Sequence, residues 1–330
     1  MAKIYSEEDS SLEPLEDKTI AIIGYGNQGR AQANNMRDSG CNLIIGNVRG
    51  DDFWDRAKED GFDVYEIAEA AKRGDIVHML VPDEIQPQVY NKDIAPAMEE
   101  GKTLCFSHGF NIHFKEIVPP RNVDVVMIAP KAPGARLREE YKEGSAAPGL
   151  LAISQDPSGK AKETALALAK AVGLTRIGVV ETSFKEEVET DLFGEQAVLV
   201  GGVSELMKAG FETLVDAGYQ PEIAYFECIN ELKLIIDLVH KQGIEGMMKA
   251  VSNTAEYGGR TRGPELIDEK ARETMKKFLE DIQDGTFTKE WVTENERGAP
   301  KLKEMREKAA KQLVESVGEK LRDWAEIEED

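Results

Sequence analysis

The sequence predicts an α/β domain with a doubly wound parallel sheet, followed by an all-helical domain. In the first half, short runs rich in Val, Ile and Leu alternate with longer polar stretches, the pattern of buried parallel strands joined by helices. After residue 182 the apolar residues follow a helical period and no clear strand is left. We therefore expect residues 1–182 to form the sheet domain and residues 183–330 the helical domain.

Each expected strand is a short apolar run bounded by Gly, Pro or Asp. In chain order these runs are Lys18–Ile23, Asn42–Ile45, Asp75–Val81, Thr103–Ser107, Val123–Ala129 and Leu150–Ser154. His78 falls inside the third run, where we expect a core histidine with satisfied hydrogen bonds. The helical domain is expected to open with a capping box, because Glu186 follows Ser183 by three residues.

The composition excludes several classes of protein. The chain has 330 residues, of which 41% are hydrophobic, and this suffices for two domains without disulfides. The three cysteines form no C-x-x-C pair, so we expect a reducing cytoplasm. The net charge of -21 disfavours nucleic-acid binding. No apolar run approaches the ~20 residues that a membrane span needs, and residues 1–11 do not resemble a signal peptide.

A glycine-rich loop follows the first expected strand and opens a helix. It reads Gly24-Tyr25-Gly26-Asn27-Gln28-Gly29 and matches G-x-G-x-x-G. In such loops the glycines permit a tight turn, close approach of the backbone to a pyrophosphate, and close helix–strand packing. The helix N-terminus offers N–H groups to the phosphates. An ordinary strand–helix turn is the alternative, but the flanking strand and helix favour a dinucleotide-binding, Rossmann-type domain.

The loop after the second strand bears on the choice of cofactor. It reads Asn47-Val48-Arg49-Gly50-Asp51-Asp52 and is expected beside the adenosine ribose. A carboxylate accepts hydrogen bonds from ribose hydroxyls and repels a 2′-phosphate, whereas Arg49 would attract the phosphate or stack on the adenine. Two carboxylates against one guanidinium favour NADH over NADPH. The alternative is that Asp51 and Asp52 only cap the next helix.

Two pairs of carboxylates in the helical domain are spaced four residues apart. They are Asp191 with Glu195 and Glu227 with Glu231, and residues four apart share one face of a helix. Each face continues into apolar or small residues, so we expect both pairs to be buried. Buried carboxylates have to be paired, protonated or bound to a metal. Four oxygen ligands suit Mg²⁺ better than zinc and predict a site for two Mg²⁺ ions, with a solvated acidic face as the alternative.

Three further polar residues are candidates for the site. His108 and Lys131 follow the fourth and fifth strands, at the edge of an open α/β sheet where ligands bind. His108 suits a general acid or base, or a structural loop histidine, and Lys131 would bring positive charge to a substrate. Ser252 suits a substrate carboxylate, although a helix N-cap is the commoner role for such a serine.

Together these segments resemble the ketol-acid reductoisomerases. The matching stretches, in the family's order, are 23–29, 106–112, 129–134, 191–196, 227–233 and 252–258. The set spans nearly the whole chain, and the length resembles the short form of the family, with one helical domain.

The resemblance implies a role for each matching residue. Metal binding would fall to Asp191, Glu195, Glu227 and Glu231, catalysis to His108 and Lys131 with the metal ligand Glu231, substrate contact to Ser252, and cofactor contact to Gly134 and the segment Asp83-Glu84-Ile85-Gln86. In such enzymes the helical domain is knotted and two chains interlock. Glu227, Glu231 and Ser252 would then come from the partner chain of an obligate homodimer.

The implied reaction has two steps. With Mg²⁺, an alkyl group of 2-acetolactate or 2-aceto-2-hydroxybutyrate migrates to the neighbouring carbon. Hydride from the nicotinamide then reduces the product to a 2,3-dihydroxy acid of the valine and isoleucine pathway. On the residues alone, two other functions stay open, a metal-independent NAD-dependent hydroxy acid dehydrogenase and a non-catalytic dinucleotide sensor.

One segment departs from the family pattern. The short form usually places Arg and then Ser residues in the loop after the second strand, where they suit a 2′-phosphate. Aligned without gaps, Val48 stands in place of that Arg and Asp51 in place of a Ser, while Phe53 offers no phosphate contact. The departure strengthens the prediction that NADH is preferred, and Arg49 leaves use of both cofactors open.

Overall fold

The computed structural model describes residues 2–324. The chain divides into two compact units, residues 1–190 and residues 191–330. Within the described residues, none of the helices combines the length and apolar character that crossing a bilayer requires.

The first unit is built on a nine-stranded sheet with the order β1-β9-β8-β7-β6-β5-β2-β3-β4. The strands are β1 (Ile4–Tyr5), β2 (Thr19–Ile23), β3 (Asn42–Asn47), β4 (Val64–Glu66), β5 (Ile76–Met79), β6 (Thr103–Phe106), β7 (Asp124–Pro130), β8 (Gly149–Gln155) and β9 (Val179–Glu181). From β4 to β7 all neighbours are parallel. The order reverses at β2, which confirms the predicted doubly wound sheet.

The prediction that all strands are parallel is wrong for β8, which runs antiparallel to β7. The intervening helix α6 (Gly134–Lys142) packs on α1 (Asn27–Asp38) and does not carry the chain back to the opposite edge of the sheet. The chain therefore re-enters the sheet from the edge at which β7 ends. The strands β1, β4 and β9 were not predicted, because two or three residues carry no readable alternation.

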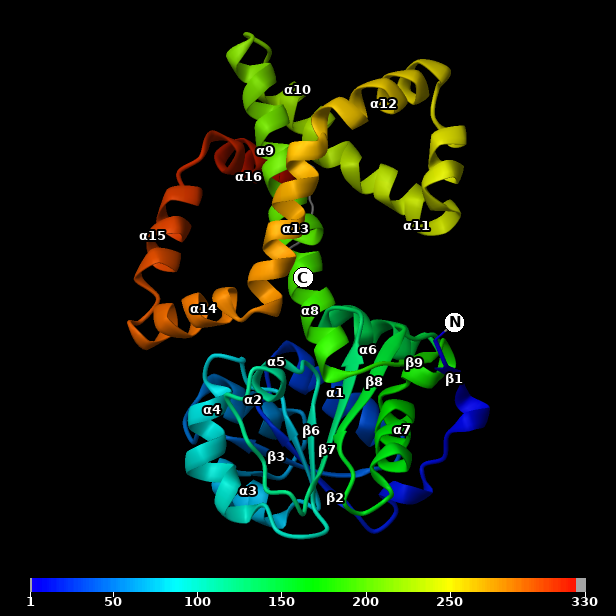
Figure 1. The fold of residues 1–330 in the computed structure, drawn as a ribbon, viewed down its shortest axis with the longest axis vertical. Helices are drawn as coiled ribbons and strands as arrows, with labels where there is room; N and C mark the ends of the chain where they lie inside the picture. Colours follow the sequence, from blue (N-terminus) through cyan, green and yellow to red (C-terminus); the bar gives the residue numbers. More distant parts are fainter. Residues whose placement is uncertain (1, 325–330) are drawn as a thin grey trace. The chain divides into compact units, whose positions relative to one another are not determined.

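Helices cover both faces of this sheet (Figure 1). The remaining helices of the unit are α2 (Asp52–Glu59), α3 (Ile67–Arg73), α4 (Gln86–Val89), α5 (Phe110–His113) and α7 (Ala161–Val172), with the π-helix η3 (Tyr90–Ile94) and the 3-10 turns η1 (Glu7–Asp9), η2 (Glu13–Leu15), η4 (Ala95–Ala97) and η5 (Leu174–Arg176). Alternate residues of β2 point to opposite faces. Ile22 packs in the core beneath α1 and α7, whereas Ile23 packs in the core beneath α3.

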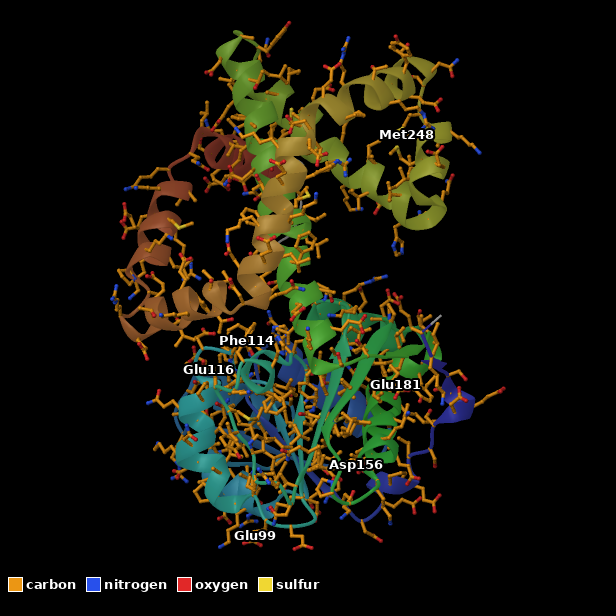
Figure 2. All side chains as sticks on the ribbon, viewed as in Figure 1. Glu99, Phe114, Glu116, Asp156, Glu181 and Met248 are labelled. Atoms are coloured by element: carbon orange, nitrogen blue, oxygen red, sulfur yellow. The ribbon has the colours of Figure 1, made fainter. Side chains whose placement is uncertain are left out.

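The second unit contains only helices in its described part. They are α9 (Gly201–Asp216), α10 (Pro221–Tyr225), α11 (Glu231–Ala250), α12 (Asn253–Leu266), α13 (Glu269–Gln283), α14 (Thr286–Glu296), α15 (Pro300–Ala309) and α16 (Leu313–Trp324), with the π-helices η6 (Glu195–Leu199) and η7 (Phe226–Asn230). The pairs α11–α12 and α14–α15 extend away from α9 and α13 (Figure 1). Side chains of these helices project into open space (Figure 2). Among the described residues of this unit, a small buried cluster centres on Phe211, Ala224, Val314 and Val317.

Helix α8 (Phe184–Gly194) begins in the first unit and ends in the second. As predicted, the Ser183 hydroxyl caps it by accepting a hydrogen bond from the backbone N–H of Glu186 at 3.1 Å. The Glu186 carboxylate accepts from the Thr182 hydroxyl at 2.7 Å, one residue before the cap. The start of the helix is therefore held by side chains on both sides of residue 183.

Candidate active site

A cavity of about 590 Å³ lies in the first unit, at the carboxyl ends of β2, β3, β5 and β6. It is lined by residues 24–28 of the glycine-rich loop, by Asn47, Val48, Asp51 and Phe53 after β3, by residues 79–83, Ile85, Gln86 and Val89 after β5, by residues 107–108 after β6, and by Ile67 and Pro130. This is the place where an open α/β sheet binds its ligand. The predicted cofactor segments and His108 are thus brought to one cavity.

The glycine-rich loop has the shape that a dinucleotide needs. Gly24 has a φ of +97°, and a Cβ there would lie 2.8 Å from Val81. A Cβ on Gly29 would lie 2.2 Å from the carbonyl oxygen of Gly24, so the helix packs closely on the strand. A Cβ on Gly26 would meet nothing within 4 Å, which leaves the N-terminus of α1 open to a phosphate. The loop therefore fits a pyrophosphate.

Tyr25 and Gln28 contribute to this loop in different ways. The Tyr25 ring is 1% exposed, and its hydroxyl donates to Asp60 at 2.7 Å. Burial and the bond to Asp60 raise the pKa of Tyr25. The Gln28 amide donates to the carbonyl oxygen of Ala132 at 2.9 Å. Both side chains hold the loop in place, and the loop backbone lines the cavity.

The loop after β3 places one carboxylate on the cavity wall. Val48, Asp51 and Phe53 line the cavity, whereas Arg49 and Asp52 do not. Asp51 also caps α2, because its carboxylate accepts the Phe53 N–H at 2.7 Å. The guanidinium of Arg49 lies 3.5 Å from the Glu66 carboxylate, which attracts its positive charge.

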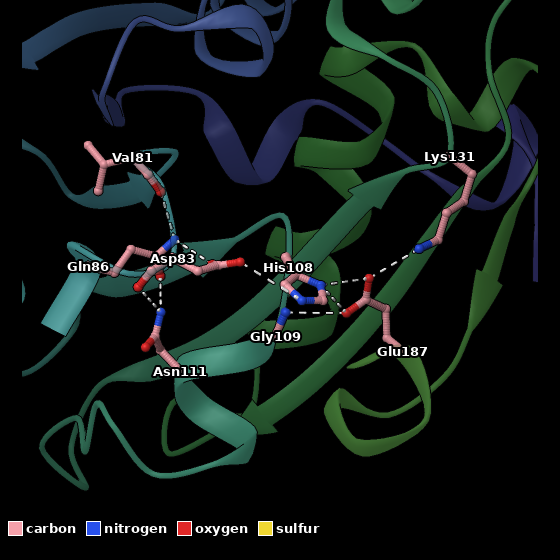
Figure 3. A network of polar contacts seen from close by, with 8 residues as sticks. All are labelled: Val81, Asp83, Gln86, His108, Gly109, Asn111, Lys131 and Glu187. Carbon is pink, nitrogen blue, oxygen red and sulfur yellow. Dashed lines mark hydrogen bonds and ion pairs between the residues drawn. The ribbon is translucent and has the colours of Figure 1, made fainter. Parts of the chain in front are cut away.

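Hydrogen bonds fix the segment after β5. The Gln86 amide donates to the carbonyl oxygen of Val81 at 2.9 Å and to the Asp83 carboxylate at 3.0 Å. The Asn111 amide donates to the Asp83 carbonyl and to Gln86, both at 3.0 Å. Figure 3 shows this network reaching toward His108. Asp83, Ile85 and Gln86 line the cavity, while Glu84 is exposed and lies off its wall.

Gly134 lies beside the glycine-rich loop and not on the cavity wall. A Cβ at Gly134 would lie 2.2 Å from the carbonyl oxygen of Asn27, so α6 packs directly on the start of α1. Gly134 lines a neighbouring cavity of about 420 Å³ that shares only Gly26 and Asn27 with the first. Its placement supports the loop from behind.

His108 is oriented by a carboxylate that sequence reasoning missed. The Nδ1 of His108 lies 3.1 Å from Glu187 Oε2 (Figure 3). The Glu187 carboxylate accepts at this position, which holds the proton on Nδ1 and fixes the orientation of the ring. The Nε2 atom lies 3.9 Å from Asp83 Oδ2, at the cavity wall.

Glu187 is 1% exposed and has three donors around it. Besides His108, the Gly109 N–H donates at 3.2 Å and the Lys131 ammonium at 3.1 Å. Burial alone would raise the pKa of Glu187, but the bond and charge of His108, with the charge of Lys131, outweigh it and lower the pKa. The buried carboxylate therefore keeps its charge. Its spacing was readable, since Glu187 stands four residues before Asp191.

The expectation that both acid pairs are buried is wrong for the described chain. Glu195, Glu227 and Glu231 are exposed, and Asp191 is half-buried. The apolar residues that continue these faces are exposed as well, with Val198 at 51% and Leu234 at 59%. The spacing identified a helix face with apolar neighbours, but the described residues of one chain leave this face exposed.

A π-helix adjoins each acid pair. Glu195 opens η6, which directly follows α8, and Glu227 lies in η7, which leads into α11 at Glu231. A π turn adds a residue to the helix and shifts its faces, and such turns are frequent at functional sites. Uniform α spacing could not predict this feature.

Ser252 caps α12 and is exposed. Its hydroxyl accepts the Ala255 N–H at 3.1 Å. The commoner role expected for such a serine is therefore present, and the hydroxyl proton is still available to a ligand.

The comparisons with known proteins agree along the whole chain. The family model for the acetohydroxy acid isomeroreductase NADPH-binding domain matches residues 14–178, and that for the ketol-acid reductoisomerase C-terminal domain matches residues 184–326. The ketol-acid reductoisomerase (NADP(+)) of Petrotoga mobilis is 56% identical over 322 residues, 98% of each chain. That of Methanocaldococcus jannaschii is 53% identical over 330 residues, 100% of each chain.

A solved structure has the same fold. It is described as an NADH-preferring ketol-acid reductoisomerase from an uncultured archean, with 52% identity, a TM-score of 0.94 and coverage of 97% of this chain and 98% of that one. With two family models and relatives above 50% identity end to end, the chain belongs to the ketol-acid reductoisomerase family.

Proposed function

We propose that this enzyme converts an acetohydroxy acid such as 2-acetolactate into the 2,3-dihydroxy acid, with NADH preferred, two Mg²⁺ ions bound and an active site shared between two chains. The observation that carries the proposal is the His108–Glu187–Lys131 cluster beside a dinucleotide-shaped cavity.

The first unit supplies the redox half of the reaction. The cofactor pyrophosphate would lie on the loop 24–29, with the adenosine toward Asp51 and the nicotinamide toward His108. His108 would exchange the proton that each step releases or consumes, through Nε2 at the cavity wall. Lys131 would add positive charge where oxygen atoms of the substrate become negative.

The donor set of the helical unit fits Mg²⁺. Asp191, Glu195, Glu227 and Glu231 offer only carboxylate oxygens, the ligands that this ion prefers. When bound, the ions would polarise the substrate carbonyl and stabilise negative charge during alkyl migration. Ser252 would contact the substrate.

The cofactor preference rests on Asp51. Asp51 lines the cavity, within the loop expected beside the ribose, and its negative charge would repel a 2′-phosphate. Arg49 lies off the wall and close to Glu66. The negative charge of Asp51, which would repel a 2′-phosphate, and the position of the Arg49 guanidinium close to Glu66 both favour NADH.

The dimer is supported by the exposed surface of the helical unit. Large apolar side chains that are about half exposed or more include Leu199, Leu206, Leu234, Ile236, Ile244, Tyr257 and Leu266. So much exposed apolar surface marks an interface. A second copy would bury these residues and bring its Glu227, Glu231 and Ser252 to the site, as expected for interlocked chains.

The test is oxidation of NADH and NADPH by the purified enzyme with 2-acetolactate and Mg²⁺, with and without a chelator. We expect oxidation that stops with the chelator and is faster with NADH. Oxidation that survives chelation would instead support a metal-independent dehydrogenase. Cofactor binding without turnover of any acetohydroxy acid would support a sensor.

A further inference from the structure

A series of connected side-chain hydrogen bonds lies behind the cavity. The Gln32 amide donates to Gln28 Oε1 at 3.1 Å and to Ser107 Oγ at 3.0 Å. Ser107 Oγ in turn lies 3.2 Å from Nε2 of His78. Both His78 and Gln32 are 0% exposed, whereas Ser107 lines the cavity beside His108. The function proposed above for the cavity does not involve this series of hydrogen bonds.

His78 fixes which way these bonds run. Its position in the core confirms the expectation for this residue, but its hydrogen bonds are not all satisfied, because Nδ1 finds no partner among the described residues. Burial lowers the pKa of His78 to about 3, so the ring is neutral. An unpaired buried N–H is rarer than an unpaired acceptor, so the proton belongs on Nε2. His78 therefore donates to Ser107.

The Ser107 hydroxyl is left as a donor toward the cavity. Its oxygen accepts from His78 Nε2 and from the Gln32 amide, which uses both lone pairs. Among the described residues, the acceptor for its proton is Gln32 Oε1, at a long 3.4 Å. A ligand oxygen at the usual O–H···O distance of about 2.7 Å would replace that contact.

The part of the cavity beside Ser107 is where the nicotinamide would lie. Val48 and Asp51 after β3 mark the adenosine end, and the glycine-rich loop lies between. Ser107, His108 and Pro130 line the opposite end, on the other side of β2. The nicotinamide carries one carbonyl oxygen, in its carboxamide group, which suits a single hydroxyl donor.

We propose that Ser107 binds the carboxamide oxygen of the nicotinamide and that His78 is the positioning residue that orients its hydroxyl. The inference rests on the proposed function of the cavity as the cofactor site. It adds a contact common to NADH and NADPH, independent of the ribose end where Asp51 acts.

The experiment measures dissociation constants of the holoenzyme for NADH, for reduced thionicotinamide adenine dinucleotide and for ADP-ribose. The sulfur of the thioamide is a weak acceptor, and ADP-ribose lacks the nicotinamide. We expect the wild type to bind NADH roughly five- to tenfold more tightly than the thio analogue, the factor that one hydrogen bond is worth. Ser107→Ala should lose the preference for NADH and leave ADP-ribose binding unchanged. Ser107→Thr, which keeps the hydroxyl, should retain the preference.

Ser39→Ala is the matched control, because Ser39 is a part-buried serine with two partners, Tyr141 and the carbonyl of Ala171, away from the cavity. His78→Leu should weaken the preference for NADH over the thio analogue in the wild-type background. It should have no effect on that preference once Ser107 is Ala.

Several results would overturn the inference. Equal dissociation constants of the wild type for NADH and the thio analogue would overturn the inference before any variant is tested. Equal losses of NADH and ADP-ribose in Ser107→Ala would show a structural role only. A preference lowered further by His78→Leu in the Ser107→Ala background would remove His78 from the assignment. Failure of the wild type to bind ADP-ribose would instead overturn the cofactor site itself.

Discussion

The two units differ in how much of their own core they contain. The sheet unit buries long rows of side chains on both faces of the sheet, such as Ile20, Ile22, Val77 and Leu104 at 0% exposure. Among its described residues, the helical unit has a small buried cluster around Phe211 and leaves large apolar residues such as Leu199 and Ile244 more than 60% exposed. Hydrophobic burial is the main driving force of folding. The described residues of the first unit therefore bury the apolar surface that drives folding, whereas those of the second leave much of theirs exposed.

The largest expected effect tests the carboxylates that the helical unit exposes. Glu231→Gln removes a negative charge and one proposed ligand oxygen. We expect turnover of 2-acetolactate to fall by about a thousandfold or more, because the metal contribution to such steps is several kcal/mol. Glu205→Gln is the control, since Glu205 is also exposed and pairs only with Lys208 among the described residues. Turnover by Glu231→Gln near the wild-type rate would remove Glu231 from the ligand set.

A change on the exposed apolar surface tests the need for a second copy. Leu234 is 59% exposed on α11, and Leu234→Asp would place a charge in the proposed interface. We expect the protein to shift toward monomers in analytical ultracentrifugation and to lose turnover, while NADH binding by the sheet unit is retained. Gln242→Asp on the same helix is the control. A Leu234→Asp protein that stays dimeric and active would place the interface elsewhere.

The core of the sheet unit is expected to respond differently. Leu104→Ala removes buried side-chain atoms from a fully enclosed position. We expect the free energy of unfolding to fall by about 2–5 kcal/mol, as for other buried leucines, with no change in oligomeric state. Denaturant titration at two protein concentrations measures both quantities. A concentration-dependent loss would show that the sheet unit also depends on the partner.

The cofactor loop offers a test confined to the sheet unit. Asp51→Ser removes the carboxylate that we propose faces the ribose. We expect the NADPH-to-NADH ratio of kcat/KM to rise roughly tenfold, which corresponds to about 1.4 kcal/mol. Asp52→Ser is the matched control, because Asp52 is exposed and lies off the cavity wall. If the two variants gave the same ratio, Asp51 would not contact the ribose.

The smallest effect concerns the buried charge at Glu187. Its pKa is lower in the folded protein, because the bonds and charges of His108 and Lys131 outweigh burial. The stability that this shift contributes is present above the unfolded pKa of about 4.3 and is lost as the pH falls through the folded value. The free energy of unfolding, measured by chemical denaturation with chelator present, should therefore differ between wild type and Glu187→Gln. This difference should become smaller below about pH 4.3. If the difference in unfolding free energy did not depend on pH, it would come from packing and not from the charge of Glu187.

Much of the sheet unit could be predicted from local patterns. Apolar runs and the glycine-rich loop predicted β2, β3, β5, β6 and β7 within about two residues, since each strand is buried on both faces. The direction of β8 could not be read, because it depends on how α6 packs and not on the residues of β8. For the site, the segments around the cavity were predicted, but Glu187 was missed.

The helical unit shows where such patterns stop. Spacing alone located the acid pairs on helices, but it assumed a uniform α-helix and a buried face. The structure has the π turns η6 and η7 beside these pairs, and the described residues leave that face exposed. A sequence pattern reports that a face is apolar and does not say which chain buries it.

The uncovered apolar surface of residues 191–324 also bears on how the enzyme is made. During synthesis the sheet unit leaves the ribosome first and has the contacts it needs to fold at once. The helical unit follows with its apolar surface exposed. In the proposed dimer a second copy covers this surface, and mass action would then set the yield of active enzyme. Slow expression would favour aggregation of unpaired chains, whereas neighbouring ribosomes on one message would supply both copies together.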